Sequence, residues 1–271
     1  MRKIIKIIAS ILTFILTVGC ATSYTPNKDG LVFEDDFNGT KLNSKKWERC
    51  PEWDRQGKSR WVDELSYLDG EGNLILRMEW NRDDLIVNCG AVRTKGLFEY
   101  GFGYYEARIK FTPHYGAWGA FWMMVGDVES EENGSKDGIE VDIIETIGNQ
   151  DGRYQHALHW DGYGDNHKSY SPELIKKINI YDGEYHTFGL LRNEEGYTFY
   201  IDGEVSSFVS AEDCEPCEKD GYLKLTCESA EWAGGGSVDC ILGLPAEMIV
   251  DYVRVYDRLP DLTLLKPQPK Q

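Results

Sequence analysis

The stretch Gly101-Phe-Gly-Tyr-Tyr-Glu-Ala-Arg-Ile-Lys-Phe111 alternates polar and apolar side chains from Tyr104 onward. Successive side chains of a β-strand point to opposite faces of the sheet. The even-numbered residues 104–110 would therefore share a polar face, and the odd-numbered residues 105–111 an apolar one. This pattern predicts a strand with one face against a core, and its polar face suits a sheet that borders an open cleft.

Other segments are rich in β-branched and aromatic residues, which also indicates strands. They are Leu31–Asp35, Leu74–Trp80, Tyr197–Ile201 and Met248–Tyr256. Turn-forming pairs punctuate the chain at Asp69-Gly70, Gly72-Asn73, Asp151-Gly152, Asp182-Gly183 and Asp202-Gly203. Only Pro172–Ile178 is expected to form a helix. Many short strands with almost no helix predict an all-β fold, a two-sheet β-sandwich or jelly roll.

The amino terminus has the character of an export signal. A basic start, Met1–Lys6, precedes an apolar run over residues 7–18. That run is shorter than the roughly 20 residues of a membrane-spanning helix. It ends at Gly19-Cys20, which resembles a bacterial lipobox and implies lipidation of Cys20; ordinary signal cleavage nearby is the alternative.

We therefore expect an exported protein, a membrane-anchored lipoprotein at the cell surface or periplasmic face. Residues 1–19 would be the signal peptide and residues 20–30 a polar tether. One sandwich domain would span residues 31–257, since about 250 residues suit a single all-β domain. Residues 258–271, with three prolines, would be a flexible tail that packs little.

The chain is strongly acidic. It has 29 Lys and Arg against 46 Asp and Glu, a net charge of −17, and losing the three cations of the leader takes it to −20. Such a surface repels polyanions, which argues against nucleic acid and heavily sulfated glycans as long-range partners. We expect a monomer that contacts the membrane only through its lipid anchor.

Seven cysteines are present. With Cys20 lipidated, an even number remains in an oxidising compartment, which predicts disulfides. The six are Cys50, Cys89, Cys214, Cys217, Cys227 and Cys240. A zinc site built around Cys214-Glu-Pro-Cys217 is the alternative. Six cysteines allow fifteen connectivities, so no pairing is assigned.

The segment Glu140-Val-Asp-Ile-Ile-Glu145 concentrates three acids. In a regular strand Glu140 and Asp142 share a face, whereas Glu145 points to the other side and into the core. Burying that charge unpaired would be costly. A β-bulge at Ile143 or Ile144 returns Glu145 to the face of the other two acids, and bulges often lie beside active sites.

Three close carboxylates cannot all stay ionised without cost, so at least one should have a raised pKa and could act as a general acid. Paired carboxylates catalyse glycoside hydrolysis, about 5–5.5 Å apart in retaining enzymes and about 6.5–9.5 Å apart in inverting ones. Strand geometry allows either separation. A solvated acidic surface and a metal site are the other interpretations.

The acidic strand and its surroundings resemble glycoside hydrolase family 16, in the form with one extra residue before the last glutamate. Segments in the family's order precede it at 90–95, 100–110 and 116–124. Others follow it at 159–160, 186–189, 197–203, 232–235 and 251–256. The resemblance covers essentially the whole mature chain. It implies a concanavalin A-like jelly roll with a substrate cleft across its concave sheet.

The resemblance also implies residue roles. Glu140 would be the nucleophile of a retaining double displacement, Glu145 the general acid and base, and Asp142 the residue that orients and tunes the pair. Catalysis would need no cofactor. The implied substrate is a β-1,3 or mixed-link β-1,3-1,4 glucan, cleaved internally.

Several further residues would contact the polysaccharide. Trp118 and Trp122 lie four residues apart, on one face of a regular strand, where indoles could stack on sugar rings; core packing is the alternative. Trp232 precedes a glycine run and suits a flexible loop at a cleft edge, and a tryptophan buried in the sandwich is the alternative. His159 follows the acidic strand by one hairpin and could donate to Asp142 or to substrate, and a purely structural histidine is the alternative. Arg93 and Glu64 are weaker cleft candidates.

Two other features follow from the resemblance. Asp251, Asp36 and the backbone of Gly72 match the place where relatives hold a structural calcium, and oxygen ligands suit that ion. Gly119 stands where a proline is common, which puts the rigidity of that segment in doubt.

Alternatives to β-glucan hydrolysis stay open. A galactan-directed hydrolase of agar, porphyran or carrageenan type would share the bulge. A transglycosylase would keep the same acids. A non-catalytic glycan-binding surface protein could use the same fold, although such a protein has no need of two glutamates flanking an aspartate.

Overall fold

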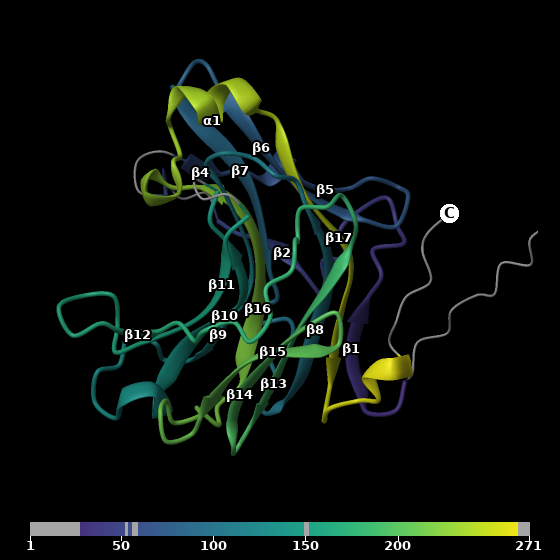
Figure 1. Cartoon of the computed structure of the whole chain (residues 1–271). Coiled ribbons are helices and arrows are strands. Elements are labelled where there is room, and N and C mark those ends of the chain that lie inside the picture. The colour runs from purple at the N-terminus through teal and green to yellow at the C-terminus, as the bar shows by residue number, and fades with distance from the viewer. Residues whose placement is uncertain (1–27, 52–53, 56–58, 149–151, 265–271) are drawn as a thin grey trace, which may run out of the picture.

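A computed structural model describes residues 28–51, 54–55, 59–148 and 152–264 of the chain. Its strands form two curved antiparallel layers, and the inner layer is concave toward the left of the view (Figure 1). The predicted signal, residue 20, most of the tether and residues 265–271 lie outside the described residues. No helix in the described ranges is long and apolar enough to cross a membrane.

The inner layer is the concave one. In order of pairing it contains β12 (Lys168–Tyr170), β11 (Tyr154–Trp160), β10 (Gly138–Thr146), β9 (Ala117–Gly126), β16 (Gly221–Ser229), β7 (Ile86–Arg93) and β2 (Glu48–Arg49). All of these neighbours are antiparallel. The long strands β9, β10 and β16 form its centre.

The convex layer packs behind it. Its strands are β15 (Glu204–Ser210), β14 (Gly196–Ile201), β13 (His186–Asn193), β8 (Gly103–Phe111), β17 (Ala246–Tyr256), β6 (Leu74–Asn81), β5 (Ser66–Leu68) and β1 (Leu31–Asp35). Strand β7 pairs with β16 of one layer and β6 of the other, so the layers join along one edge. Short strands β3 (Asp54–Arg55) and β4 (Ser59–Trp61) lie beside β7.

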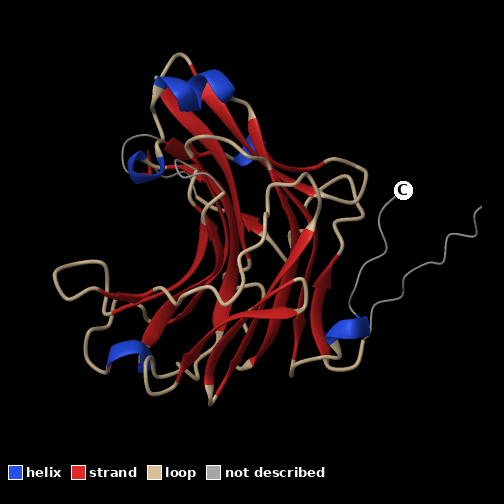
Figure 2. Ribbon diagram, in the orientation of Figure 1, coloured by secondary structure: helices blue, strands red, loops and turns tan. Residues whose placement is uncertain are grey.

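Helical structure is confined to short pieces around the strands (Figure 2). They are η1 (Asp63–Leu65), η2 (Gly134–Lys136), η3 (Glu231–Ala233), α1 (Val238–Gly243) and η4 (Leu262–Leu264). The predicted all-β sandwich is confirmed. The hydrophobic core lies between the layers and contains Phe121 and Ile143 of the concave layer with Ile109 and Val253 of the convex one.

The alternation of residues 104–111 predicts strand β8 correctly, but its polar face does not border the cleft. Ala107 and Ile109 point into the core, as expected. Glu106 on the other face is itself buried and accepts hydrogen bonds from the hydroxyls of Tyr104 and Tyr252, at 2.9 and 2.7 Å. Strand β8 belongs to the convex layer, where this polar face is covered.

The predicted helix over Pro172–Ile178 is wrong. That segment has no regular secondary structure, because its backbone bonds to strand β15 instead of to itself. The amide of Ile175 donates to the carbonyl of Ser206 at 2.7 Å, and the Ser207 hydroxyl donates to the carbonyl of Glu173 at 2.8 Å. The described α-helix is α1, where Ser237 caps the amide of Cys240.

Two other expectations also need correction. The six cysteines of the described chain are buried free thiols, not disulfides. On neighbouring strands Cys227 pairs with Gly90 rather than with Cys89, so the two thiols point to opposite faces of the sheet. The described part of the tail packs: Pro260 is buried, and Leu262 lies against the cluster of Tyr104, Tyr200 and Tyr256.

Candidate active site

A β-bulge in β10 gathers the three acids on the concave face. Against β11, Asp142 pairs with Ala157 and Glu145 with Gln155, so Ile143 and Ile144 together oppose the single residue His156. Against β9, Asp142 pairs with Trp122 and Ile144 with Phe121, which identifies Ile143 as the inserted residue. Both isoleucines are fully buried. The predicted bulge is confirmed, and its physical reason is the one expected from the sequence. The bulge keeps Ile143 and Ile144 inside the core while Glu145 lies on the same face as the other two acids.

Strand register places the acids within a lattice of cross-strand neighbours. From β11 toward β7 the rows are His159–Glu140–Met124–Tyr222, Ala157–Asp142–Trp122–Lys224–Arg93 and Gln155–Glu145–Ala120–Thr226–Ala91. Directly opposite side chains in such rows touch one another. Each acid therefore has its own surroundings, although the three lie close together in sequence.

Glu145 is buried and held by two donors. The indole nitrogen of Trp118 donates to its Oε1 at 2.6 Å, and the amide nitrogen of Gln155 donates to its Oε2 at 2.7 Å. Burial raises the pKa of Glu145, while these two hydrogen bonds oppose the rise. A carboxyl group with a raised pKa in a fixed orientation suits a general acid.

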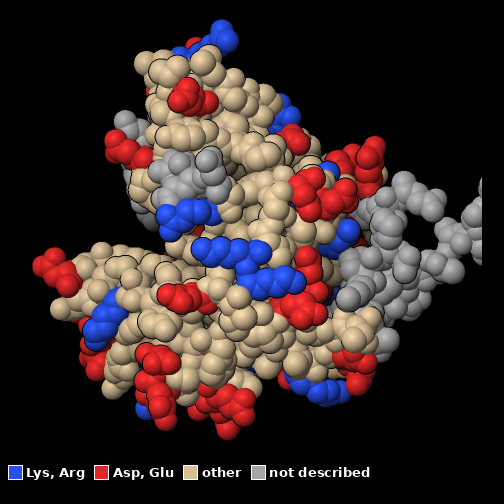
Figure 3. All heavy atoms as spheres, viewed as in Figure 1, with Lys and Arg blue, Asp and Glu red and all other residues tan. Residues whose placement is uncertain are grey.

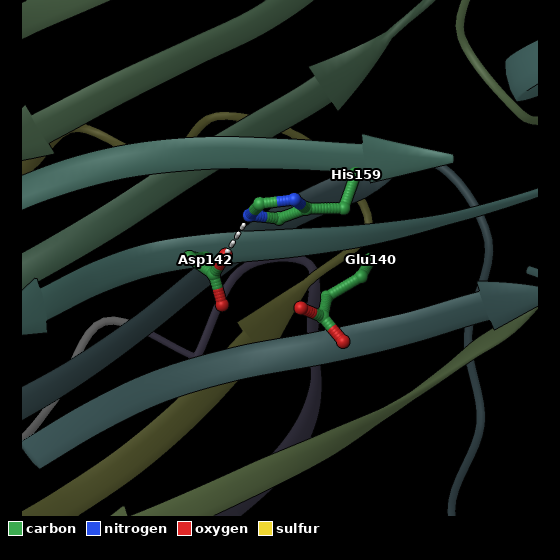
Figure 4. Close-up of side chains that lie close together, drawn as sticks. All are labelled: Glu140, Asp142 and His159. Carbon is green, nitrogen blue, oxygen red and sulfur yellow. Dashed lines mark ion pairs between the residues drawn. The ribbon is translucent and has the colours of Figure 1, made fainter. Parts of the chain in front are cut away.

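Asp142 lies deepest. Among the described residues its buried Oδ2 accepts no hydrogen bond, and Nε2 of His159 lies 3.4 Å from it (Figure 4). Burial, followed by the charges of Glu145 and Glu140, raises the pKa of Asp142 well above its usual range. The neutral form is therefore favoured, and its proton can be shared with a neighbouring carboxylate.

Glu140 is the most accessible of the three acids, and a residue that the sequence did not indicate contacts it. Tyr163, between β11 and β12, donates its hydroxyl hydrogen to Oε2 of Glu140. Nearby, Nε2 of His167 lies 3.0 Å from Nδ1 of His159, and the two imidazole rings stack. The sequence analysis therefore missed three residues of the site, Tyr163, His167 and Gln155. Two of them lie in a connecting loop and one is a glutamine within a strand, and neither position has a distinctive sequence pattern.

The ligand atoms of Glu140, Asp142 and His159 all lie within 4.8 Å of one another. Of the described residues, these are the group whose geometry could hold a metal ion. Figure 4 shows the two carboxyl groups and the imidazole converging from neighbouring strands. Within this group Glu140 also accepts a hydrogen bond from Tyr163.

The predicted tryptophans occupy three different situations. Trp118 bonds Glu145, and its ring meets that of Trp232 edge to face with centroids 5.0 Å apart. Trp232 is 41% exposed, as a cleft-edge aromatic would be. Trp122 is only 7% exposed: its nitrogen donates to Thr226 at 3.1 Å, and the ammonium group of Lys224 lies 3.6 Å from its ring centroid. The face of Trp122 is therefore in contact with the ammonium group of Lys224 and is not free to stack on a sugar ring.

The weaker candidates for substrate binding lie in different parts of the fold. Arg93 is on the concave sheet and donates to Glu48 at 2.5 Å. Glu64 is exposed in η1, which packs against β6 and β7. Gly119 lies inside strand β9 and not in a loop, and its amide donates to the hydroxyl of Thr146 at 2.8 Å. A proline there would lose this hydrogen bond, so the glycine does not loosen the segment.

The two aspartates of the predicted calcium site each face an arginine. Asp251 accepts from Arg108 at 2.6 Å in a buried pair, and Asp36 accepts from Arg254 at 2.9 Å. Gly72 lies in the turn before β6 with a positive φ of 88°. Calcium at these residues stays a prediction, and the ion would have to compete with both guanidinium groups.

Known proteins share this architecture. Residues 32–258 match the family model described as "Beta-porphyranase A-D, GH16 domain". A keratan-sulfate endo-1,4-β-galactosidase of Sphingobacterium multivorum is 28% identical over 89% of this chain and 58% of its own length. A glucan endo-1,3-β-glucosidase A1 of Niallia circulans is 22% identical over 89% of this chain and 40% of its length. The chain thus spans about half the length of these curated relatives.

Among solved structures, a Bacteroides ovatus family 16 protein from a mixed-linkage glucan utilisation locus, in complex with a G4G4G3G product, has a TM-score of 0.69. It is 22% identical, and the similarity covers 82% of this chain and 99% of that one. This likeness supports the fold, and the family model covers most of the sequence, including the bulged acidic strand. The chain belongs to glycoside hydrolase family 16.

Proposed function

We propose that the chain is an endo-acting, retaining glycoside hydrolase that cleaves a β-linked polysaccharide. The observation that supports this most is the bulged strand β10, which presents Glu140, Asp142 and Glu145 on the concave face with Glu145 held by Trp118 and Gln155. Figure 3 shows a hollow on this side of the molecule, above the projection that carries β12. A polysaccharide could lie across this open hollow and extend beyond it in both directions, as internal cleavage requires.

In the first step, Glu145 protonates the glycosidic oxygen while an oxygen of Glu140 attacks the anomeric carbon. The bond to the leaving sugar breaks and a glycosyl ester of Glu140 forms. In the second step, ionised Glu145 takes a proton from water, the water oxygen bonds to the anomeric carbon, and Glu140 leaves as a carboxylate. Two inversions give net retention. Asp142, whose pKa is raised by burial and by the charges of Glu145 and Glu140, lies between the two glutamates on the strand and tunes their ionisation.

The first substrate candidate is a β-1,3 or mixed-link β-1,3-1,4 glucan. The names of the Niallia circulans relative and of the Bacteroides ovatus complex support it. The net charge of −17 also suits a neutral polymer. Exposed Trp232, beside Trp118, offers an indole edge and face to a sugar ring at the end of the cleft.

The second candidate is a galactose-containing polysaccharide. Its support is the porphyranase-type family model and the name of the Sphingobacterium multivorum relative. Although the whole molecule is acidic, Lys224 and Arg93 lie in the same cross-strand row of the concave sheet as Asp142, beyond Trp122, and Figure 3 shows lysine and arginine side chains near the hollow. A local cation could bind an anionic substituent that the overall charge would repel at long range.

Digestion of laminarin, lichenan, agarose, porphyran, carrageenan and keratan sulfate decides between these substrates. Early release of mixed oligosaccharides indicates internal cleavage, and proton NMR of the first product shows whether the β-anomer is retained. Glu140→Ala and Glu145→Gln should each lower hydrolysis at least about 10⁴-fold with the fold intact. Glu204→Gln, an exposed acid at the start of convex strand β15, serves as the control.

Full activity in Glu140→Ala contradicts the assigned roles. Binding to a polysaccharide without cleavage of any polymer in the panel would favour a glycan-binding surface protein instead.

We also infer export and lipidation from residues 1–20, which lie outside the described part of the chain. In a bacterial host the protein should sediment with membranes, and Cys20→Ala should release it to the soluble fraction. Equal membrane association of both forms would contradict the anchor.

A further inference from the structure

Among the described residues, Tyr163 contacts one of the three acids from a loop rather than from a strand of the concave sheet. It lies in the connection 161–167 between β11 and β12, and its hydroxyl donates to Oε2 of Glu140. The same hydroxyl lies 3.8 Å from the sulfur of Met124, the cross-strand neighbour of Glu140. Tyr163 as a residue is 49% exposed, so it forms part of the cleft surface.

The connection is anchored on both sides of Tyr163. Asp161 and Gly162 have positive φ angles of 60° and 71°, which turn the chain sharply after β11. The Gly162 amide donates to the carbonyl of Val128 at 2.7 Å, and the buried carboxylate of Asp161 pairs with Lys168 at 2.7 Å. Farther along, Asn166 donates to Glu131 at 2.6 Å. Tyr163 therefore reaches Glu140 from a fixed backbone.

Burial and the neighbouring charge of Glu140 raise the pKa of the Tyr163 phenol. The group thus remains protonated at any pH where the protein works, and it acts as a donor. A hydroxyl that donates to a carboxylate forms a charge-assisted hydrogen bond, which is stronger than a neutral one and fixes the acceptor's orientation.

We propose that Tyr163 is a positioning residue for the nucleophile, which holds Oε2 of Glu140 and leaves Oε1 as the oxygen that bonds to the anomeric carbon. This inference rests on the proposed retaining function. In the glycosyl ester, Oε2 becomes the carbonyl oxygen and can still accept from Tyr163. In the second step the same hydrogen bond stabilises the carboxylate as it leaves.

Tyr163→Phe removes only the hydroxyl and tests the inference. We expect kcat to fall about 10- to 100-fold, the value of a lost hydrogen bond to a charged group, while KM changes less than about twofold. Inactivation by a 2-deoxy-2-fluoro glycoside with a good leaving group, which measures formation of the ester, should slow in parallel. Tyr170→Phe, an exposed tyrosine on the adjacent strand β12, should match the wild type. Wild-type kcat in Tyr163→Phe overturns the proposal.

A double-mutant cycle separates positioning of Glu140 from a role in binding sugar. In Glu140→Ala, sodium azide should restore turnover of an activated aryl glycoside and give a glycosyl azide of inverted configuration. Adding Tyr163→Phe should change this rescued rate less than about twofold, because the carboxylate it positions is gone. A loss as large as in the wild-type background overturns the proposal.

The two failures are distinguishable. If Glu140→Ala keeps its activity, or if azide yields no inverted product, the proposed function fails regardless of Tyr163. If Glu140 behaves as the nucleophile while Tyr163→Phe lowers rescue, only the positioning role fails.

Discussion

The Nδ1 nitrogen of His156 lies 2.6 Å from the carbonyl oxygen of Ile143, the residue inserted in the β10 bulge. Burial lowers the pKa of His156 to about 4, so the ring is neutral near pH 7. Its Nε2 lies 2.9 Å from the hydroxyl of Ser206 on β15. We assign Nδ1–H as the donor to Ile143, which leaves Nε2 to accept from Ser206. The convex layer thus supports the bulge through one imidazole.

Replacing this imidazole should affect both stability and activity. His156→Leu leaves the buried carbonyl of Ile143 without its donor and should lower the free energy of unfolding by about 1–3 kcal/mol. The bulge should also shift, so kcat should fall as Glu145 loses its orientation. Urea denaturation and hydrolysis rates measure the two effects. Ser206→Ala, which keeps the bond to Ile143, should cost about 1 kcal/mol with little change in kcat. Equal losses of kcat in both variants would contradict the assignment.

His156 also predicts a pH dependence of stability. Its pKa is depressed from 6.5 to about 4 in the folded chain, so the folded state binds fewer protons than the unfolded state in this window. The stabilisation is present above pH 6.5 and is lost as the pH falls toward 4. The difference in unfolding free energy between wild type and His156→Leu should narrow by up to about 3 kcal/mol between pH 7 and pH 4. Acids whose surroundings the substitution leaves unchanged, such as Glu106 on β8, cancel in this difference. A constant difference would exclude a neutral buried His156.

Gln155 should tune the general acid. Its amide stabilises the ionised form of Glu145, so Gln155→Leu should raise the pKa of Glu145 further. The alkaline limb of the pH profile of kcat/KM reports loss of the acid's proton, and this limb should move to higher pH. We expect kcat/KM at the optimum to fall about tenfold. A shift to lower pH would indicate that Glu145 is not the proton donor.

Trp232 should contribute to polysaccharide binding rather than to chemistry. Trp232→Ala removes a 41% exposed indole whose ring lies edge to face against Trp118. The KM for the polymer should rise about fivefold, equivalent to about 1 kcal/mol, with kcat nearly unchanged. Initial rates over a range of polymer concentrations measure both constants. Trp122→Ala, which empties a nearly buried position, should instead lower the melting temperature.

Calcium removal tests the convex side of the sandwich. Because Arg108 and Arg254 already neutralise Asp251 and Asp36, EDTA should leave hydrolysis unchanged and shift the melting temperature by less than about 2 °C. Differential scanning calorimetry with EDTA and with added calcium measures the shift. A large decrease that calcium reverses would show that the predicted ion binds despite the arginines.

The sequence by itself determined the strands, the position of the acids and the need for a bulge. Strand side chains repeat every two residues, and Glu145 is an odd number of positions from Glu140 and Asp142. Because a buried unpaired carboxylate is costly, only an inserted residue satisfies both the core and the three acids, as Ile143 does. That reasoning needs nothing beyond the local chain.

Only the tertiary structure decided what each acid touches. Glu145 meets Trp118 from β9 and Gln155 from β11, and Glu140 meets Tyr163 from a connecting loop. Tertiary contacts also decided that the polar face of β8 is buried. They likewise decided that residues 172–178 form no helix, because the backbone there donates to β15. Local periodicity fixes which side of a strand a residue occupies. Its partner depends on the register between strands that are distant in sequence, and a pattern within one strand does not contain that register.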